Sequence, residues 1–284
     1  MDSVARLLIT CPDRPGIVAA VTGFLYSHGV NITALDQHST DPSDGTFFMR
    51  LEFQTPHMDV TRPALEAAFR TVVADRFHMD WRLTYSSDTK KVAVFVSREE
   101  HCLMELLWRW ARGEIDCTIT NVISNHPDLK EAVERFGAAY HYIPVSKDNK
   151  AEAEAAMLDV LGQDTDVVVL ARYMQILSGD FVSCFDHRMI NIHHSFLPAF
   201  AGADPYRQAM DKGVKLIGAT AHYVTEELDG GPIIEQGTAR VSHRHNVDDL
   251  KGLGRDLERQ VLARAVKWHL EDRIIVFRNK TVVF

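Results

Sequence analysis

The sequence predicts an α/β protein with two domains: a ferredoxin-like α+β domain over residues 1–86, then a doubly wound, mostly parallel, Rossmann-like domain over 87–284. Two patterns and the break between them support this prediction. Up to residue 86 the apolar periodicity follows the order β-α-β-β-α-β. From residue 91 strands and helices alternate, as in parallel sheets with right-handed crossovers. The polar stretch 86–90 separates the two patterns.

The elements of the first domain follow from apolar spacing and turn residues. Apolar residues recur at helical spacing from Ile17 to Leu25, and Gly29 stands where a helix C-cap is expected. Residues 41–45 (Asp-Pro-Ser-Asp-Gly) are a hairpin turn signal between two strands. The predicted elements are a strand (4–10), a helix (17–28), two strands (31–38 and 46–54), a helix (63–77) and a strand (79–86).

This first domain resembles an ACT domain. The resemblance rests on Asp13-Arg14-Pro15-Gly16-Ile17-Val18 after the first strand and on His28-Gly29-Val30-Asn31-Ile32 before the second. It implies a small amino-acid effector and pairing of the domains into a homodimer or homotetramer. Gly16 allows a close backbone turn, and the N-terminus of the next helix can receive a carboxylate. Ligand sensing and a purely oligomerising role both stay open.

Two strands of the second domain are almost wholly apolar, at 92–96 and 166–171. Such runs are typical of parallel strands that are buried on both faces. The predicted elements are strands at 92–96, 116–124, 166–171, 189–193, 216–225 and 232–241, helices at 102–112, 129–136, 151–161, 178–185, 205–212 and 247–269, and a terminal hairpin at 274–284.

Composition narrows the class of protein. Of the 284 residues, 46% are apolar and 25% charged, which is normal for a soluble globular chain. The net charge of −8 argues against a nucleic-acid partner, and no apolar run approaches the ~20 residues of a membrane span. The four cysteines form no CxxC pair, so neither a zinc site nor a disulfide framework is indicated. With no signal-peptide pattern at the N-terminus, we expect a cytoplasmic enzyme with reduced thiols.

Three polar residues are candidates for catalysis. Asn191 and His193 are two positions apart at the end of a predicted strand, so their side chains share one face. Ligands of doubly wound sheets bind at this end of the strands. An asparagine amide can donate to an oxyanion, and a histidine can move protons near neutral pH. Asp229 follows in the turn 228–232, and a carboxylate can fix the histidine in one tautomer.

The surrounding motifs resemble the family of formyltransferases that use formyltetrahydrofolate, over residues 91–284. They are Asn191-Ile192-His193-x-Ser195-x-Leu197-Pro198, Gly218-Ala219-Thr220-Ala221-His222-Tyr223-Val224, Leu228-Asp229-Gly230-Gly231-Pro232-Ile233-Ile234 and the upstream loop Tyr173-Met174-Gln175-Ile176-Leu177-Ser178. The resemblance implies that Asn191, His193 and Asp229 are catalytic. It also implies a folate site formed by Met174, Gln175, Ile176, Leu177, Ser195, His222, Thr225 and Leu228. His194, beside the catalytic histidine, is expected to point to the opposite face of the strand.

One turn departs from the family pattern. Formyltransferases that act on glycinamide ribonucleotide have a glycine-rich turn after the first strand of this domain, where backbone N–H groups hold the phosphate. Here residues 97–101 read Ser-Arg-Glu-Glu-His, with no glycine and two carboxylates that repel a phosphate. We therefore expect no phosphorylated acceptor, which leaves water as the acceptor.

Together, the ACT-like domain and the altered turn make the chain similar to the formyltetrahydrofolate deformylases. This resemblance implies hydrolysis of 10-formyltetrahydrofolate to formate and tetrahydrofolate, which supplies formate for purine synthesis and balances the one-carbon pool. The folate is then the substrate, and neither a cofactor nor a metal is expected. Three alternatives stay open: formyl transfer to a non-phosphorylated amine, a non-catalytic regulator that responds to amino acids, and a metallohydrolase.

Overall fold

The computed structural model describes residues 4–41, 44–198 and 205–284, and its chain forms two compact units. One unit extends to Thr89 and also contains Asp272–Ile275 and Val282–Phe284. The other comprises Lys90–Glu271 and Val276–Thr281. The sequence-based division into 1–86 and 87–284 differs from this in two ways. The first unit extends to Thr89, and it also includes residues 272–275 and 282–284. Within the described ranges, no helix has the length and apolar character needed to cross a membrane.

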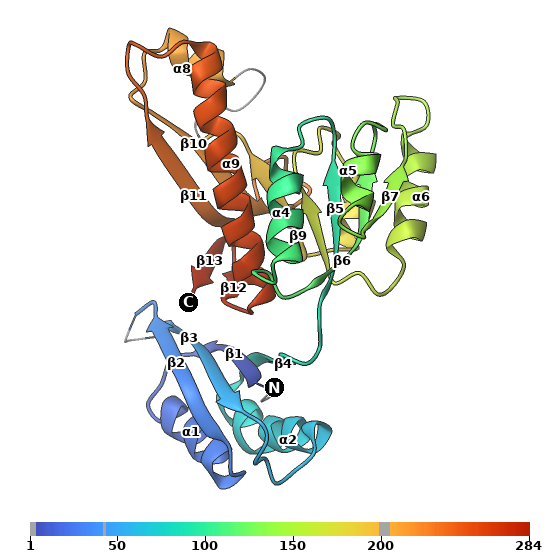
Figure 1. The fold of residues 1–284 in the computed structure, drawn as a ribbon. Coiled ribbons are helices and arrows are strands. Elements are labelled where there is room, and N and C mark those ends of the chain that lie inside the picture. The colour runs from blue at the N-terminus through green and yellow to red at the C-terminus, as the bar shows by residue number, and fades with distance from the viewer. Residues whose placement is uncertain (1–3, 42–43, 199–204) are drawn as a thin grey trace. The chain divides into compact units, whose positions relative to one another are not determined.

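The N-terminal unit is an antiparallel sheet with helices on one face (Figure 1). The strand order is β2-β3-β1-β4. Alternate residues of β1, such as Leu7 and Ile9, enter the core against the helices. The elements are β1 (Val4–Pro12), α1 (Ile17–Ser27), β2 (Asn31–Ser39), β3 (Thr46–Gln54), α2 (Arg62–Phe69), the π-helical turn η1 (Arg70–Ala74), α3 (Asp75–Phe77) and β4 (Asp80–Tyr85).

The π-helical turn interrupts what the sequence predicted as one α-helix over 63–77. Leu65, Phe69, Val73 and Phe77 are all buried and lie four positions apart. An α-helix has 3.6 residues per turn, so a strict spacing of four drifts around its surface. One turn with i→i+5 bonds corrects this drift, and all four side chains then stay in the core.

Asp272 belongs to this unit although it lies far along the chain. Its carboxylate is almost fully buried and accepts a hydrogen bond from Thr84 Oγ1 at 2.9 Å. Oδ1 lies 3.3 Å from Arg82 Nη2, and Oδ2 lies 3.7 Å from Arg6 Nη1. These partners on β1 and β4 explain why residues 272–275 group with the first unit and not with the second.

The C-terminal unit is built on a sheet with the strand order β11-β10-β9-β8-β5-β6-β7. Strands β5 to β9 are parallel, and β10 and β11 continue the sheet as an antiparallel hairpin. The short edge strand β7 was not predicted, because its sequence Ala-Tyr-His-Tyr lacks an apolar run. The strands are β5 (Lys91–Val96), β6 (Thr118–Ser124), β7 (Ala139–Tyr142), β8 (Val167–Leu170), β9 (Met189–His193), β10 (Leu216–Tyr223) and β11 (Ile233–Arg240).

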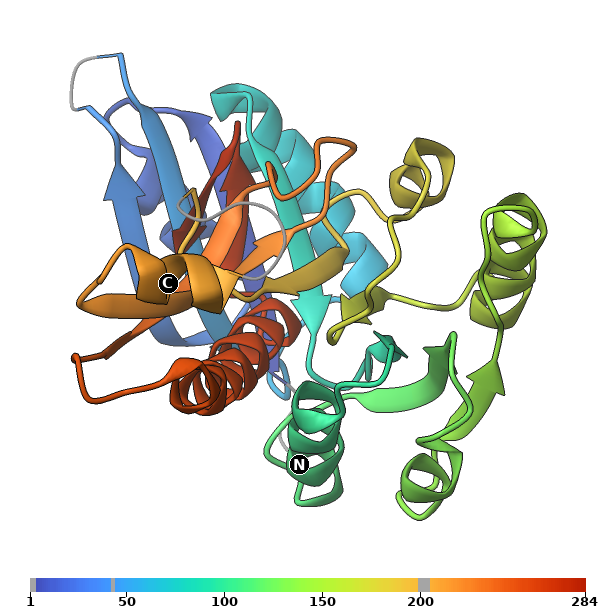
Figure 2. The ribbon, with the colours of Figure 1, turned by 90° about the horizontal axis from the view of Figure 1, so that it is seen from above.

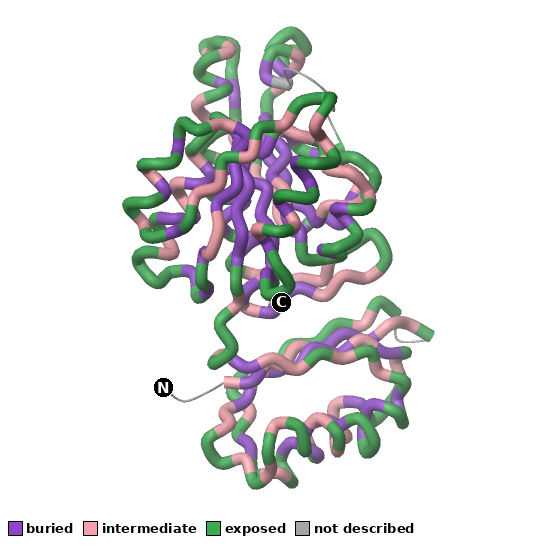
Figure 3. Tube along the Cα trace, turned by 90° about the vertical axis from the view of Figure 1, so that its right-hand side faces the viewer, coloured by how far each residue is buried: buried purple, intermediate pink, exposed green. Residues whose placement is uncertain are grey.

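Helices cover this sheet and bury its central strands, as Figure 3 shows. The long helix α9 contacts β9, β10, β11 and α4, and Figure 2 shows α9 and α4 next to each other. A capping box between Asn246 and Asp249 begins α9. The remaining elements are α4 (His101–Ala111), α5 (Lys130–Glu134), α6 (Lys150–Leu161), α7 (Gly179–Ser183), α8 (Pro205–Asp211), α9 (Val247–Leu270) and the predicted terminal hairpin, β12 (Ile274–Phe277) with β13 (Lys280–Val283).

The sheet reverses its strand order between β5 and β8. From β5 the chain proceeds outward to β6 and β7, then returns to β8 on the other side of β5. Ser97, directly after β5, donates its N–H to the carbonyl of Arg172 after β8, at 3.2 Å. Met174 N–H donates to Ser97 Oγ at 2.9 Å, which ties the loop after β8 to the end of β5. A topological switch of this kind is where ligands bind in doubly wound folds.

Candidate active site

Asn191 and His193 lie at the carboxyl end of β9, as predicted. The antiparallel pairing with β10 places His222 opposite Asn191. Asn191 Nδ2 donates to His222 Nε2 at 3.2 Å, and His222 Nδ1 donates to the Tyr223 carbonyl at 2.9 Å. These two bonds hold His222 in one tautomer and orient the amide of Asn191. One N–H of that amide engages His222, and the amide has a second N–H that can donate to another acceptor.

Asp229 reaches this group from the loop between β10 and β11. The loop folds tightly on the end of β10, since a Cβ atom on Gly231 would lie 1.9 Å from the Tyr223 carbonyl oxygen. Asp229 itself has φ 55°, a left-handed conformation that aspartate tolerates better than most residues. Its Oδ2 lies 3.1 Å from His193 Nδ1, and its Oδ1 lies 3.5 Å from His222 Nε2.

The electrostatics of the group favour an ionised Asp229. The hydrogen bond from His193, and next the nearby His222, hold the pKa of this carboxyl well below its usual range, although burial opposes them. An ionised carboxylate accepts the Nδ1 proton of His193, so the lone pair of that ring is on Nε2. Nε2 is buried and has no hydrogen-bond partner among the residues that the structure describes. His193 is therefore set up to accept a proton at Nε2.

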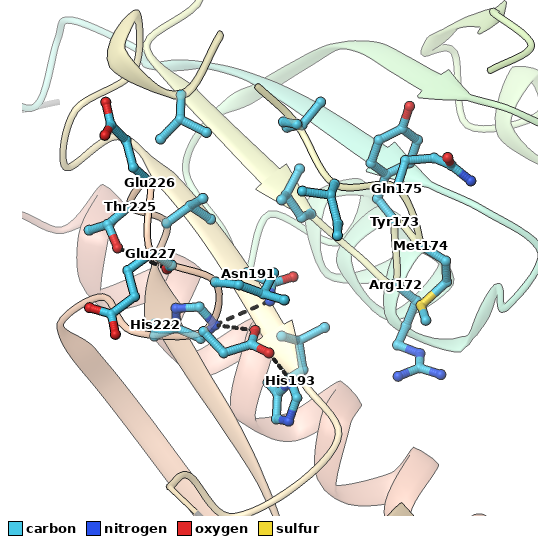
Figure 4. A pocket seen from close by; sticks show the side chains of 18 of the residues that line it. Arg172, Tyr173, Met174, Gln175, Asn191, His193, His222, Thr225, Glu226 and Glu227 are labelled. Carbon is cyan, nitrogen blue, oxygen red and sulfur yellow. Dashed lines mark hydrogen bonds and ion pairs between the residues drawn. The ribbon is translucent and has the colours of Figure 1, made fainter. Parts of the chain in front are cut away.

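A cavity of about 490 Å³ opens beside these residues (Figure 4). Asn191, His193 and His222 gather on one side of the view, and Tyr173, Met174 and Gln175 lie on the other. The lining includes the predicted folate-site residues Met174, Gln175, Ile176, Leu177, His222, Thr225 and Leu228. Three of these are apolar yet exposed, Met174 at 58%, Ile176 at 66% and Leu228 at 67%. Exposed apolar side chains at a cavity mouth suit a ligand with apolar rings.

Ser195 is the predicted site residue that the structure does not bring to the cavity. It is buried, and its carbonyl accepts a hydrogen bond from Thr220 Oγ1 at 2.9 Å. Thr220 Oγ1 in turn accepts from Leu197 N–H at 3.1 Å. Ser195 thus lies in the segment that anchors the chain after β9 to β10.

The expectation that His194 points away from the site is wrong. Strand β9 ends at His193, so side chains no longer alternate at the next residue, and His194 also lines the cavity. Its ring centroid lies 5.0 Å from that of His193. Burial lowers the pKa of His194 to about 4, with a contribution from the cationic Arg172, so the ring is neutral at physiological pH.

The sequence reasoning missed three charged residues of the cavity wall, Arg172, Glu226 and Glu227. Arg172 follows the buried strand β8 and has φ 64°. A charged residue directly after an apolar parallel strand is the signal that identifies it, because the ends of such strands line the ligand site. The two glutamates belong to the loop before Asp229, and no spacing pattern distinguishes them from ordinary loop residues.

Known proteins share both the sequence and the fold of this chain. A family model described as formyl transferase matches residues 90–266, and one described as ACT domain matches residues 5–70. The chain is 57% identical to formyltetrahydrofolate deformylase of Bacillus subtilis, over all of this chain and 94% of that protein.

Solved structures agree with these matches. A formyltetrahydrofolate deformylase from Pseudomonas syringae superposes with a TM-score of 0.96 at 51% identity, over 100% of this chain and 95% of that one. A glycinamide ribonucleotide transformylase from Symbiobacterium toebii has a TM-score of 0.64 at 30% identity, over 69% of this chain and 94% of that one.

Proposed function

Because the chain belongs to the formyltetrahydrofolate deformylases and hydrolyses 10-formyltetrahydrofolate to formate and tetrahydrofolate, we propose that Asn191, His193 and Asp229 carry out this reaction. The observation that carries the proposal is the geometry of His193. Its Nδ1 is bound to Asp229 at 3.1 Å, and its Nε2 is buried without a partner among the described residues.

In the first step, Nε2 of His193 takes a proton from water while the water oxygen attacks the formyl carbon. The formyl oxygen becomes an oxyanion, and the amide of Asn191 donates a hydrogen bond to it. The tetrahedral intermediate then collapses, the bond from carbon to N10 breaks, and His193 returns its proton to N10. The products are formate and tetrahydrofolate.

Asp229 acts through His193. Its carboxylate holds the ring in the tautomer with hydrogen on Nδ1 and stabilises the imidazolium that forms during the first step. The lowered pKa of Asp229 supports this role, because a carboxylate that stays ionised keeps accepting the Nδ1 proton and so leaves the lone pair of the ring on Nε2.

The folate binds in the cavity of about 490 Å³. Met174, Ile176 and Leu177 contact the pterin and aryl rings, and the loop from Thr225 to Asp229 presents backbone groups to the pterin edge. The proposed reaction uses neither a cofactor nor a metal, since the oxyanion is stabilised by an amide and the proton is moved by an imidazole.

For the ACT domain we propose a small amino-acid effector and assembly into a homodimer or homotetramer. Its match to the ACT family supports both. We further propose that the enzyme works in the cytoplasm, where its formate supplies purine synthesis and its turnover balances the one-carbon pool.

The direct test mixes the purified protein with 10-formyltetrahydrofolate in an amine-free buffer and measures formate. We expect release at enzyme-like rates, and loss of that release in His193→Ala with folate affinity retained. The exposed turn residue His243 provides the control, so His243→Ala should match the wild type. Turnover that appears only after an amine is added would replace water by that amine as the acceptor. Full activity in His193→Ala would remove the assigned base.

A further inference from the structure

Glu154 on α6 is a buried carboxylate that the catalytic steps do not use. It is 9% exposed and belongs to the buried face of the helix, with Ala153 and Met157. Both of its oxygens bind one residue. The backbone N–H of Ser178 donates to Oε1 at 2.9 Å, and the Ser178 hydroxyl donates to Oε2 at 2.5 Å. Burying a carboxylate costs free energy unless donors compensate it, and here Ser178 supplies two of them.

Ser178 is the residue at which the cavity loop ends and α7 begins. Its Oγ accepts from the backbone N–H of Phe181 at 3.2 Å, so it is the N-cap of α7. The same hydroxyl donates to Glu154, so it is engaged both as a donor and as an acceptor. Phe181 is 1% exposed and packs in the core. Together these contacts fix the end of the loop against α6.

The other end of the loop is held in the same manner. Met174 N–H donates to the buried Ser97 hydroxyl, as described above, and that hydroxyl donates to Asn125 Oδ1 at 2.8 Å. Met174 and Ile176, which lie between the two attachments, carry the exposed apolar side chains of the cavity wall. Figure 4 shows Met174 on the side of the cavity opposite the catalytic group. The segment that meets the ligand is therefore short and attached at both ends.

This attachment matters because the loop exposes apolar side chains before any ligand is bound. A free loop with such side chains samples many conformations, and a ligand that needs one of them loses affinity by selecting it. Fixing the backbone of each residue costs about 1–2 kcal/mol of conformational entropy. When side chains of the protein already hold the loop, that cost belongs to folding and no longer to binding.

We propose that Glu154 is a positioning residue for the substrate: by binding Ser178 with both carboxylate oxygens, it holds the loop 174–177 in the conformation that receives the folate. The inference rests on the proposed folate site in this cavity. Neither Glu154 nor Ser178 is among the described residues that line the cavity, so Glu154 acts through the loop. Its effect belongs to substrate affinity and not to the chemical step at His193.

The test compares the kinetics of Glu154→Ala, Ser178→Ala and the double variant in formate release. We expect KM to rise roughly 5–20-fold in each, with kcat within about twofold of the wild type. The double variant should be no worse than the weaker single variant, because both remove the same contact. Glu154→Gln should restore KM to within about threefold, since its amide can accept from the Ser178 N–H and donate to the hydroxyl.

Two controls separate positioning from general stability. Glu152→Ala changes an exposed carboxylate on the same helix and should match the wild type. Val133→Ala removes apolar volume from the core at α5, so it should lower the thermal midpoint and leave KM unchanged. Hydrogen exchange of the peptide 174–178 is the readout that needs no turnover. The Ser178 amide should exchange roughly tenfold faster in Glu154→Ala, and near the wild-type rate in Glu154→Gln.

Three results overturn the proposal. One is a folded Glu154→Ala with wild-type KM, whether or not its loop exchanges faster. Another is an equal rise of KM in Val133→Ala, which would make the effect one of stability. If Glu154→Ala does not fold, Ser178→Ala decides alone, and an unchanged KM in that variant is the third. A wild type that releases no formate would contradict the proposed reaction instead, and folate affinity, measured by fluorescence quenching, would then replace KM in every comparison.

Discussion

Of the histidine–carboxylate pairs in the C-terminal unit, two differ in how many further partners their atoms have. His193 and Asp229 meet at 3.1 Å, and His101 and Glu258 meet at 2.8 Å. In the first pair the carboxylate side chain is 21% exposed, His193 lines a cavity, and the far nitrogen of its ring, Nε2, has no hydrogen-bond partner among the described residues. In the second the carboxylate side chain is 2% exposed and is shared among His101, Tyr206 and Arg172.

This difference separates reactivity from charge compensation. A ring whose second nitrogen is free can move a proton, and a carboxylate saturated with donors can only carry a fixed charge. The same two residue types therefore have different roles, proton transfer in one pair and a fixed charge in the other. The number of additional hydrogen-bond partners decides which role a pair has. Each of the following substitutions tests this contrast between the two pairs.

Asp229→Asn should have the largest effect. The amide removes the charge that stabilises the imidazolium and allows the other tautomer of His193, so kcat should fall by about 10²–10⁴. Formate release measured from pH 6 to 8 checks this. Unchanged activity across that range would remove the orienting role of Asp229 and with it the contrast between the two pairs.

Asn191→Ala should follow. It removes one donor to the oxyanion, which costs on the order of 10²–10³ in kcat. Folate affinity, measured by fluorescence quenching, should stay near that of the wild type, because the amide acts on the transition state. A variant that loses affinity and keeps kcat would make Asn191 a binding residue and not a catalytic one.

Glu258→Gln should change stability more than turnover. Leaving Arg172 buried without its counter-charge costs about 3 kcal/mol of unfolding free energy at pH 7. The pKa of Glu258 is lower in the folded than in the unfolded chain, so this contribution is complete above the unfolded value near ~4.3 and is lost as the pH falls further. The unfolding free energies of wild type and variant, measured with urea, should therefore differ by a constant amount from pH 7 to 5 and converge below about pH 4. A difference in unfolding free energy that grows as the pH falls would contradict this direction.

Leu228→Ala should have the smallest effect, because this residue contributes to folate binding and not to the chemical step. This side chain lines the cavity but is 67% exposed without ligand. Losing its apolar contact with the folate should raise KM by roughly 3–10-fold, about 1 kcal/mol, with kcat unchanged. Leu216, which is 50% exposed and lies outside the cavity, gives the matched control Leu216→Ala. Equal KM values for the two variants would place the folate elsewhere.

Strand alternation predicted that Asn191 and His193 share one face at the end of a strand. Their assignment to the site, like that of Asp229, came from the family resemblance. The same alternation misled at His194, because the strand ends one residue earlier. Only the pairing register of β9 with β10 shows that His222 stands opposite Asn191.

The group of charged residues around Glu258 could not be predicted, because its members meet only through packing. His101 and Glu258 are 157 positions apart, and no local pattern joins them. By sequence alone, Gly254 is only a residue of low helix propensity. The structure shows that the Tyr206 hydroxyl packs where a Cβ atom at this position would lie. The π-helical turn η1 is a similar case. The spacing of four between apolar residues was visible in the sequence, but the π-helical turn that keeps them all in the core was not.

Asp272 has a consequence for the order in which the chain is made. It compensates Arg6 and Arg82 in the N-terminal unit, yet it is synthesised 188 positions after its partner Thr84. At ~5–20 residues per second, roughly 10–40 s of translation separate the two. During that interval Arg82 lacks the Asp272 carboxylate, and Arg6 has only Glu52 as an acidic partner. The first unit to begin folding is therefore completed only after the second has been translated, and a ribosome that stalls in between leaves an unfinished client for chaperones.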